Sequence, residues 1–282
     1  MRFICATLVS LAALVAAAPP YNNTTLFACG NPHPTEDHLA MLAKIVDEEQ
    51  MTTSEASEIP PVNVHFHIIA SSKTEAGGWV NDSQITDQVA VMNTNYNPNG
   101  ITFKLAGTSR TVNAGWAQGQ DTEAMKTALR KGKYSDLNIY LQQSLGGNIA
   151  GICTLPNSVG GQGSYNTDGC QVVTGSLPSG GPHNGLNDGK CAVHEVGHWF
   201  GLLHTFQGGC DAPGDYIDDT PYEKSAPQGG GCPTGLNSCP NQPGNDPIHN
   251  HMDYTSGDCK TQFTAGQEKR MHTQWDKFRA GK

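Results

Sequence analysis

The chain carries little charge and no surplus of positive charge. Charged residues make up 15% of its 282 positions, and 17 lysines and arginines stand against 26 aspartates and glutamates, so the formal net charge is −9. Proteins that bind nucleic acid neutralise phosphates with lysine and arginine and therefore carry a basic patch or stripe. The sequence argues against a nucleic-acid partner.

Long hydrophobic runs are missing beyond the start of the chain. At the N-terminus, Arg2 precedes a mostly apolar run over residues 3–15 and a run of alanines. This order is typical of a secretory signal peptide, so we expect residues 1–18 to be removed, with cleavage near Ala17 or Ala18. No later stretch reaches the roughly 18 apolar residues of a membrane-spanning helix. We therefore predict a secreted, extracellular protein with no membrane partner.

Sequons and cysteines agree with an extracellular location. Asn22, Asn23 and Asn81 each begin an Asn-x-Ser/Thr sequon, the acceptor pattern of N-glycosylation. Loss of Cys5 with the signal peptide leaves eight cysteines, which an oxidising compartment favours as disulfides. These are Cys29, Cys153, Cys170, Cys191, Cys210, Cys232, Cys239 and Cys259.

The stretch HEVGHWFGLLH at residues 194–204 carries the clearest chemical signal. His194 and His198 are four residues apart, so on a helix their imidazoles share one face and both can bind one Zn²⁺. Gly201 permits the left-handed backbone that ends a helix, and His204 then supplies a third imidazole. Three protein ligands leave an open position for water, which is typical of a catalytic zinc site. Glu195 is placed to move a proton beside it.

Residues 19–58 differ in character from the rest and are expected to form a pro-segment. Residues 36–51 can form one amphipathic helix, and a polar stretch over residues 52–58 follows it. The alternative is an N-terminal helix that stays docked in the mature protein. Cys29 lies in this segment. Its thiolate could occupy the open zinc position and keep the enzyme latent, or it could form a disulfide.

Residues 59–282 are predicted to form the main domain, of α/β (α+β) class. Three stretches have the pattern of strands, at residues 62–68, 101–105 and 137–141, and two helices capped by Asp82 and Asp121 alternate with them. Ile85, Val89 and Met92 are expected to face inward on the first helix, and Met125, Ala128 and Leu129 on the second. Residues 152–155 and 170–173 are shorter strand candidates. The final helix is predicted from a capping box of Thr264 and Gln267 and a buried stripe of Met271, Trp275 and Phe278.

Several details beyond the zinc motif resemble one peptidase family. The motif matches the long His-Glu-x-x-His-x-x-Gly-x-x-His signature of the metzincins. Met252 lies downstream in Asn-His-Met-Asp-Tyr, and metzincins place such a methionine beneath the zinc ligands. Together with His-Thr-Phe after the motif and the stretch over residues 214–221, this resembles the pappalysin family, and its secreted fungal members most.

The resemblance implies a fold, a set of roles and a class of substrate. It implies a twisted mixed sheet packed with helices and a zinc cleft between an upper and a loop-rich lower subdomain. The strand at residues 170–173 is expected to border the cleft. Tyr254 would stabilise the oxyanion, and Asp215 and Thr220 would lie at a structural Ca²⁺ site. The substrates would be extracellular proteins and peptides. Apart from the resemblance, we expect the protein to be a monomer.

The resemblance also implies two disulfides, Cys210–Cys239 and Cys232–Cys259. The pairing of Cys29, Cys153, Cys170 and Cys191 stays open, because Cys170 and Cys191 stand where the family usually has other residue types.

Two alternatives remain at the level of sequence. A thermolysin-like peptidase would need a glutamate as third ligand, and only Glu223 and Glu268 follow Glu195. Neither has a suitable setting. The second alternative is a secreted zinc-binding or adhesive module without catalysis. The presence of Glu195 argues against it, because metal binding alone does not require that residue.

Overall fold

The fold is described from a computed structural model of the chain. The structure describes residues 28–51, 58–157, 162–179, 187–227 and 231–282. The predicted signal peptide and the sequons at Asn22 and Asn23 lie outside the described residues. In the described part of the chain, no helix is long and apolar enough to cross a membrane.

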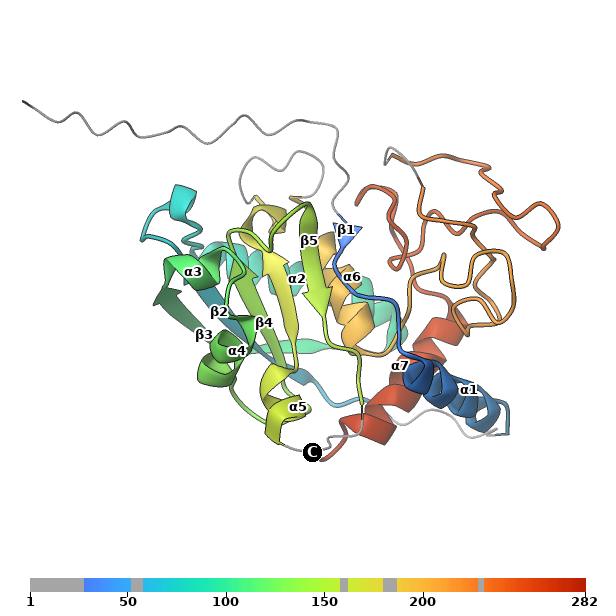
Figure 1. Cartoon of the computed structure of the whole chain (residues 1–282), viewed down its shortest axis with the longest axis horizontal. Helices are drawn as coiled ribbons and strands as arrows, with labels where there is room; N and C mark the ends of the chain where they lie inside the picture. The colour runs from blue at the N-terminus through green and yellow to red at the C-terminus, as the bar shows by residue number, and fades with distance from the viewer. Residues whose placement is uncertain (1–27, 52–57, 158–161, 180–186, 228–230) are drawn as a thin grey trace, which may run out of the picture.

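A mixed six-stranded sheet, in the order β1-β5-β6-β4-β2-β3, forms the centre of the described structure (Figure 1). Strands β3, β2, β4 and β6 are parallel, β5 runs antiparallel to β6, and β1 pairs parallel with β5 at the edge. The bounds are β1 Ala28–Cys29, β2 Val62–Ala70, β3 Phe103–Val112, β4 Leu137–Gln142, β5 Ile149–Cys153 and β6 Cys170–Val173.

Helices cover both faces of the sheet. Their bounds are α1 Glu36–Met51, α2 Asp82–Tyr96, α3 Ala114–Ala117, α4 Thr122–Leu129, α5 Gln162–Thr167, α6 Lys190–Trp199 and α7 Ala265–Phe278. The larger core unites one face of the sheet with α2, α6 and α7. A smaller cluster around Met125 and Tyr140 joins α3 and α4 to the other face. The layers agree with the predicted mixed sheet packed with helices.

Strand β2 is buried on both of its faces. Ile68 lies in the larger core and Ile69 in the smaller one, so α3 and α4 exclude water from the second face of the strand. His67 is accommodated there by two hydrogen-bonding contacts, Nδ1 to Ser109 Oγ at 2.8 Å and Nε2 to Asn138 Oδ1 at 2.9 Å. These two contacts are those of an ordinary strand residue.

Of the two caps predicted for α2 and α4, Asp121 is the N-cap residue of α4, whereas Asp82 is not that of α2. The side chain of Asn81, not Asp82, caps α2, and it forms a capping box with Gln84. Asp121 does precede α4, but at a φ of 49° its side chain makes no capping hydrogen bond within the described chain. Asn81 can take the place of Asp82 as the cap of α2, because asparagine and aspartate are both favoured at the N-cap position.

Two apolar residues of the predicted elements face outward, and for Ala128 this contradicts the inward-facing prediction. Leu105 on β3 is 39% exposed, because the register of β3 against β2 shifts next to this position, between Val64 and His65. Ala128 on α4 is also exposed, and the buried position beside Met125 is taken by Lys126. The Lys126 Nζ donates to the carbonyl oxygens of Thr167 and Gly169, so the buried ammonium is satisfied.

The strand that borders the site is β5, not β6 as the resemblance implied. Strand β6 lies inside the sheet between β5 and β4, while β5 returns antiparallel outside it. Strand β1 of the N-terminal segment then adds to β5 as the edge strand. Sequence order does not reveal such a reversal.

A long irregular stretch between α6 and α7 forms a second, loop-rich part of the molecule (Figure 1). It contains the disulfides Cys210–Cys239 and Cys232–Cys259, the two pairs implied by the resemblance. A third bond, Cys153–Cys170, joins β5 to β6. Among the described cysteines, Cys29 and Cys191 are free.

Helix α7 begins at the predicted capping box. Thr264 Oγ1 accepts from Gln267 N at 3.1 Å, and Gln267 Oε1 accepts from Thr264 N at 3.0 Å. We expect Thr264→Ala to lower the free energy of unfolding by about 1 kcal/mol, since one amide of the first turn loses its acceptor. Chemical denaturation measures the change. The matched variant Thr273→Ala, on the same helix, should have a smaller effect, and equal losses would contradict a specific role for the cap.

Candidate active site

Helix α6 carries His194 and His198 and ends just before Gly201. Leu202 N donates to Gly197 O and Gly201 N donates to His198 O, which is the hydrogen-bond pattern of a Schellman ending. Gly201 has a φ of 92°, and a Cβ there would lie 2.6 Å from the Gln274 side chain. The turn brings His204 back to the face of α6 that carries the other two imidazoles.

The three imidazoles converge with their Nε2 atoms inward. His194 Nδ1 lies 2.8 Å from His251 O, and His198 Nδ1 lies 2.8 Å from Leu202 O. A carbonyl can only accept, so these contacts place the ring proton on Nδ1 and a lone pair on Nε2. Burial keeps the rings neutral, since it lowers the pKa of His198 to about 4.

The donor set fits a metal ion. The Nε2 atoms of His198 and His204 are 3.1 Å apart, and His194 Nε2 is buried with no hydrogen-bond partner among the described residues. Because His198 Nε2 carries a lone pair, the two nitrogens can lie this close only with a proton or a cation between them. Cys29 Sγ completes a group of four in which all ligand atoms lie within 4.8 Å of one another. Three imidazoles and a thiolate are ligands that zinc accepts.

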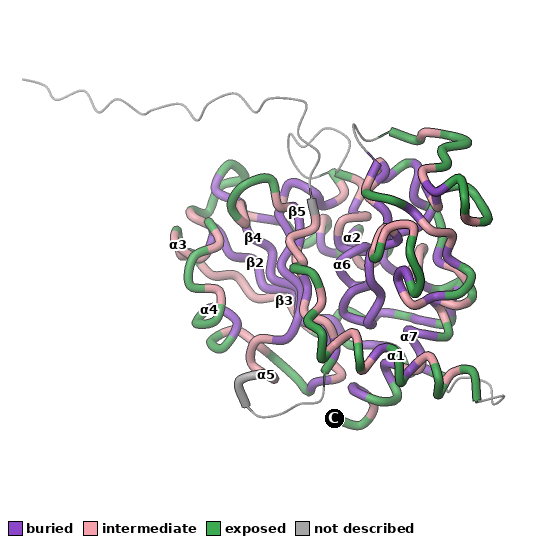
Figure 2. The backbone as a smooth tube through the Cα atoms, turned by 45° about the vertical axis from the view of Figure 1, so that its right-hand side comes forward, coloured by how far each residue is buried: buried purple, intermediate pink, exposed green. Residues whose placement is uncertain are grey.

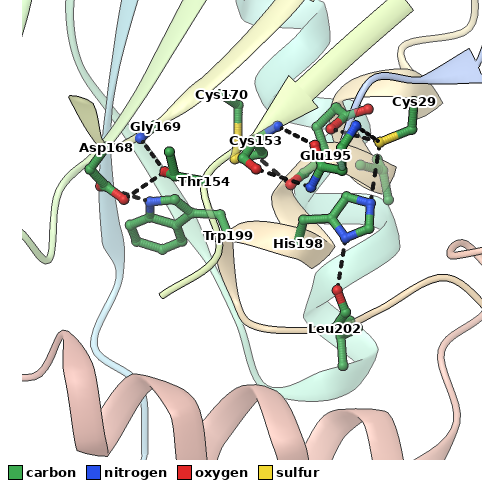
Figure 3. The surroundings of a disulfide bond; sticks show 12 residues. Cys29, Cys153, Thr154, Asp168, Gly169, Cys170, Glu195, His198, Trp199 and Leu202 are labelled. Atoms are coloured by element: carbon green, nitrogen blue, oxygen red, sulfur yellow. Dashed lines mark hydrogen bonds between the residues drawn. A yellow bond between two sulfur atoms is a disulfide. The ribbon is translucent and has the colours of Figure 1, made fainter. Parts of the chain in front are cut away.

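Cys29 reaches this group from the edge strand β1 (Figure 3). Its Sγ lies 3.4 Å from His198 Nε2 and 3.5 Å from Glu195 Oε2. The next residues hold the segment against β5, where Gly30 N donates to Gly151 O at 2.7 Å and Asn31 forms two hydrogen bonds with the Cys153 backbone. Of the two fates open to Cys29 in the sequence, the structure has the free thiol at the imidazoles.

Glu195 lies beside the imidazoles and is 1% exposed. Burial raises the pKa of its carboxyl group to about 8. Room for the side chain comes from Gly151 on β5, where a Cβ would approach Glu195 Cγ to 2.4 Å. Glu195 therefore has a pKa close to neutrality, which suits a group that both accepts and donates a proton.

Met252 and Tyr254 lie below and beside the three histidines. Met252 is fully buried and packs against α6 at Gly197, where a Cβ would lie 2.4 Å from its sulfur. The Tyr254 hydroxyl is 3.2 Å from His204 Nε2 and donates to Cys29 O at 3.1 Å. Burial raises the Tyr254 pKa, so the hydroxyl keeps its proton. Met252 thus packs against the helix that carries His194 and His198, and Tyr254 contacts His204.

Asp215 and Thr220 meet at a separate, buried place in the loop-rich part. They line a cavity of about 80 Å³ together with Asp218. Asp215 Oδ1 accepts from Ile217 N, while Asp215 Oδ2 and Thr220 Oγ1 have no hydrogen-bond partner among the described residues. Burial raises the pKa of Asp215 to about 8. Oxygen donors left unpartnered in a buried cavity suit a hard cation.

A pair of buried carboxyl groups, which the sequence patterns did not predict, lies near the site: Glu223 and Asp253 are both 0% exposed. Glu223 Oε2 accepts from Thr205 Oγ1 at 2.7 Å, which ties the residue after His204 to the loop beyond it. Burial and the facing Asp253 raise the pKa of Glu223, so the two carboxyl groups can share a proton. Neither Glu223 nor Glu268 belongs to the histidine group. The Asp-Tyr sequence after Met252 was the available signal for Asp253, but it does not identify Glu223 as the partner.

The pair predicts a loss of stability at alkaline pH. A carboxyl group with a raised pKa in the folded state binds more protons there than in the unfolded chain. Its contribution to the free energy of unfolding is therefore complete below the unfolded pKa of about 4.5 and is lost as pH rises through the folded pKa. Zinc-saturated protein should therefore have a lower Tm at pH 9 than at pH 6. Glu223→Gln should reduce that fall, and Asp82→Asn on the surface should not. An unchanged fall in Glu223→Gln would contradict the shared proton.

Comparisons with known proteins agree with the geometry. The family model described as pregnancy-associated plasma protein-A matches residues 118–276. An extracellular metalloprotease of Pyricularia oryzae is 46% identical over 92% of this chain and 92% of its own length. Extracellular metalloprotease 1 of Coccidioides posadasii is 44% identical over 97% of each chain.

Solved structures show the same fold. Promirolysin of Tannerella forsythia, in a mutant form, aligns with a TM-score of 0.69 at 22% identity and covers 85% of this chain and 87% of its own. Mature mirolysin with a cleaved peptide aligns with a TM-score of 0.63 at 24% identity, covering 76% and 91%. The family match, the relatives and the fold agree: this chain belongs to the pregnancy-associated plasma protein-A (pappalysin) family of metzincins and is a zinc metalloprotease.

Proposed function

We propose that this protein is a secreted endopeptidase that cuts peptide bonds of extracellular proteins and peptides and is made as a latent precursor. The observation that carries the proposal is the Glu195 carboxyl group beside three inward-facing imidazole Nε2 atoms on one buried helix and its return turn. A binding module has no use for a buried carboxyl group at this position.

His194, His198 and His204 would hold the metal. When bound, zinc would lower the pKa of a water molecule toward about 7 and polarise the substrate carbonyl. Glu195 would accept the proton of the attacking water and then donate it to the leaving amine. The Tyr254 hydroxyl, which keeps its own proton, would donate a hydrogen bond to the carbonyl oxygen as negative charge develops there.

The N-terminal segment would close the site before activation. We infer that residues 1–18 are the signal peptide, 19–58 the pro-segment and 59–282 the catalytic domain. Three features support this division: strand β1 lies along β5, Cys29 lies at the imidazoles, and the Tyr254 hydroxyl is engaged by Cys29 O. A substrate could reach neither Glu195 nor Tyr254 while the segment is in place.

Three further features complete the proposal. The relatives' names support secretion, and Asn81 is an exposed sequon on the described surface that could carry a glycan. Asp215 and Thr220 would hold a structural Ca²⁺, supported by their unpartnered buried oxygens. The protein would act as a monomer.

The test combines metal analysis with digestion. Protein secreted from its producing cells should contain one tightly bound zinc per chain after processing and should digest casein. A chelator should stop digestion, and added zinc should restore it. Digestion that ignores the chelator would overturn the zinc-dependent mechanism. Bound zinc without any digestion, in a processed chain, would favour the non-catalytic module instead.

A further inference from the structure

Helix α1 covers a defined surface on the loop-rich side of the molecule, away from the catalytic residues. It lies beside α7 in both views (Figures 1 and 2). Leu42 and Ile45 of α1 are fully buried there between Leu203 and Phe278. We call the α7 side of this contact the α1-docking surface, and it consists of Leu203, Tyr216, Arg270, Lys277 and Phe278.

Charge complementarity across this contact is as clear as the apolar packing. Arg270 donates two hydrogen bonds to the Glu49 carboxylate, from Nε at 2.9 Å and from Nη2 at 3.0 Å, and its side chain is only 2% exposed. Lys277 Nζ lies 2.6 Å from a carboxylate oxygen of Glu48 on the protein surface. Helix α1 has five carboxylates and one lysine, so an acidic helix faces basic side chains of α7.

Removal of α1 would leave the α1-docking surface with an unpaired buried charge and exposed apolar side chains. Of its partners among the described residues, Arg270 would keep only the Tyr216 carbonyl, which accepts from its Nη2 at 2.8 Å. A buried guanidinium without its carboxylate is costly, and uncovered Leu203 and Phe278 would add an exposed apolar patch. A ligand that pairs with Arg270 and covers the apolar side chains would recover much of the free energy lost with α1.

The α1-docking surface is continuous with the region of the zinc ligands. Leu203 directly precedes His204, and both line a cavity of about 160 Å³ that also contacts His198 and Leu155. Leu155 packs against the cluster beneath α1 as well. The N-terminal segment itself spans this distance, from Cys29 at the imidazoles to α1 on α7. A single polypeptide can therefore occupy both places.

We propose that, after processing, the α1-docking surface binds acidic amphipathic helices of protein substrates and so increases their capture outside the catalytic cleft. The preferred helix would carry two aliphatic residues three positions apart and a pair of glutamates three residues further on, as Leu42, Ile45, Glu48 and Glu49 do. The inference rests on the proposed function, because the surface is free only once residues 19–58 have left.

Binding is tested first, independently of catalysis. A specific protease site placed within residues 52–57 of the zinc-loaded full chain allows cleavage between α1 and β2, after which gel filtration separates the segment. A labelled peptide of residues 35–51 should bind the processed protein, and its Glu49→Gln form about 10-fold more weakly, since a charge-assisted pair is lost. No binding up to about 1 mM peptide, or equal binding of both peptides, would overturn the proposal. Retention of the segment after cleavage would also overturn it, since the surface would stay covered.

Substrate capture is tested next with a fusion of the α1 sequence, a flexible linker and a short peptide that the processed protein cuts. KM for the fusion should be about 10-fold lower than for the same fusion carrying Glu48→Lys and Glu49→Lys, with equal kcat. Lys277→Glu should reduce the difference in KM between the two fusions. With this variant, a fusion carrying Glu48→Lys alone should restore part of the difference. Lys104→Glu, on the distant strand β3, should leave the difference unchanged. Equal KM values for the two fusions would overturn the proposal. Failure to cut the short peptide itself would instead overturn the proposed function.

Discussion

Glu195→Gln should lower kcat/KM of the processed protein for casein by about 10³-fold, the size expected when a general acid–base group is lost. Glutamine keeps the shape of the side chain beside Gly151 but cannot accept a proton from water. Zinc content should stay at one per chain, because Glu195 is not among the four converging ligand atoms. Steady-state digestion and metal analysis on the same preparation measure both quantities.

The control for Glu195 is an exposed carboxylate in the first turn of α4, Glu123. Glu123→Gln should retain wild-type turnover. If Glu195→Gln also retained it, with zinc bound, the proton-transfer role would belong to another group.

Cys29→Ala should release the activity of the unprocessed chain. The thiol at the imidazoles and the β1–β5 pairing act together to close the site, so loss of the thiol leaves only the backbone and α1 contacts. We expect peptidase activity of the full chain to rise by about 10²-fold, as the fraction of chains with an accessible site increases. Hydrolysis of a short peptide, followed from the first seconds after mixing and paired with mass analysis of the chain, measures this before processing occurs.

A second cysteine provides the comparison for Cys29. Cys191 is the other free thiol in the described chain, but it lies on α6 and is not in the ligand group. Cys191→Ala should leave the full chain latent. Activation by both variants alike, or by neither, would contradict a specific role for Cys29 in latency.

Local signals in the sequence predicted much of the candidate site. His194, His198 and His204 come together because an α-helical repeat and one glycine fix their relative positions within eleven residues. The capping box of α7 and the full extent of α1 follow from equally local patterns. The position of Tyr254 came from the resemblance, since no local rule places a tyrosine fifty residues downstream beside His204.

The parts that could not be predicted depend on contacts between distant segments. The Cys153–Cys170 bond requires β5 to run antiparallel outside β6, which a parallel α/β pattern does not suggest. Leu105 turned outward because of a register shift against β2. Glu223 and Asp253 are thirty residues apart in an irregular stretch. Their pairing appears only when the loop and the methionine turn pack together.

X-ray absorption at the zinc edge tests the central claim most directly, because it measures the ligands of the metal in both the full and the processed chain. For the full chain we predict three nitrogen ligands at about 2.0–2.1 Å and one sulfur at about 2.3 Å. After processing, the sulfur should be gone and the three nitrogens should remain. A shell without sulfur in the full chain, sulfur that persists after processing, or fewer than three nitrogens would contradict a three-histidine zinc site closed by Cys29.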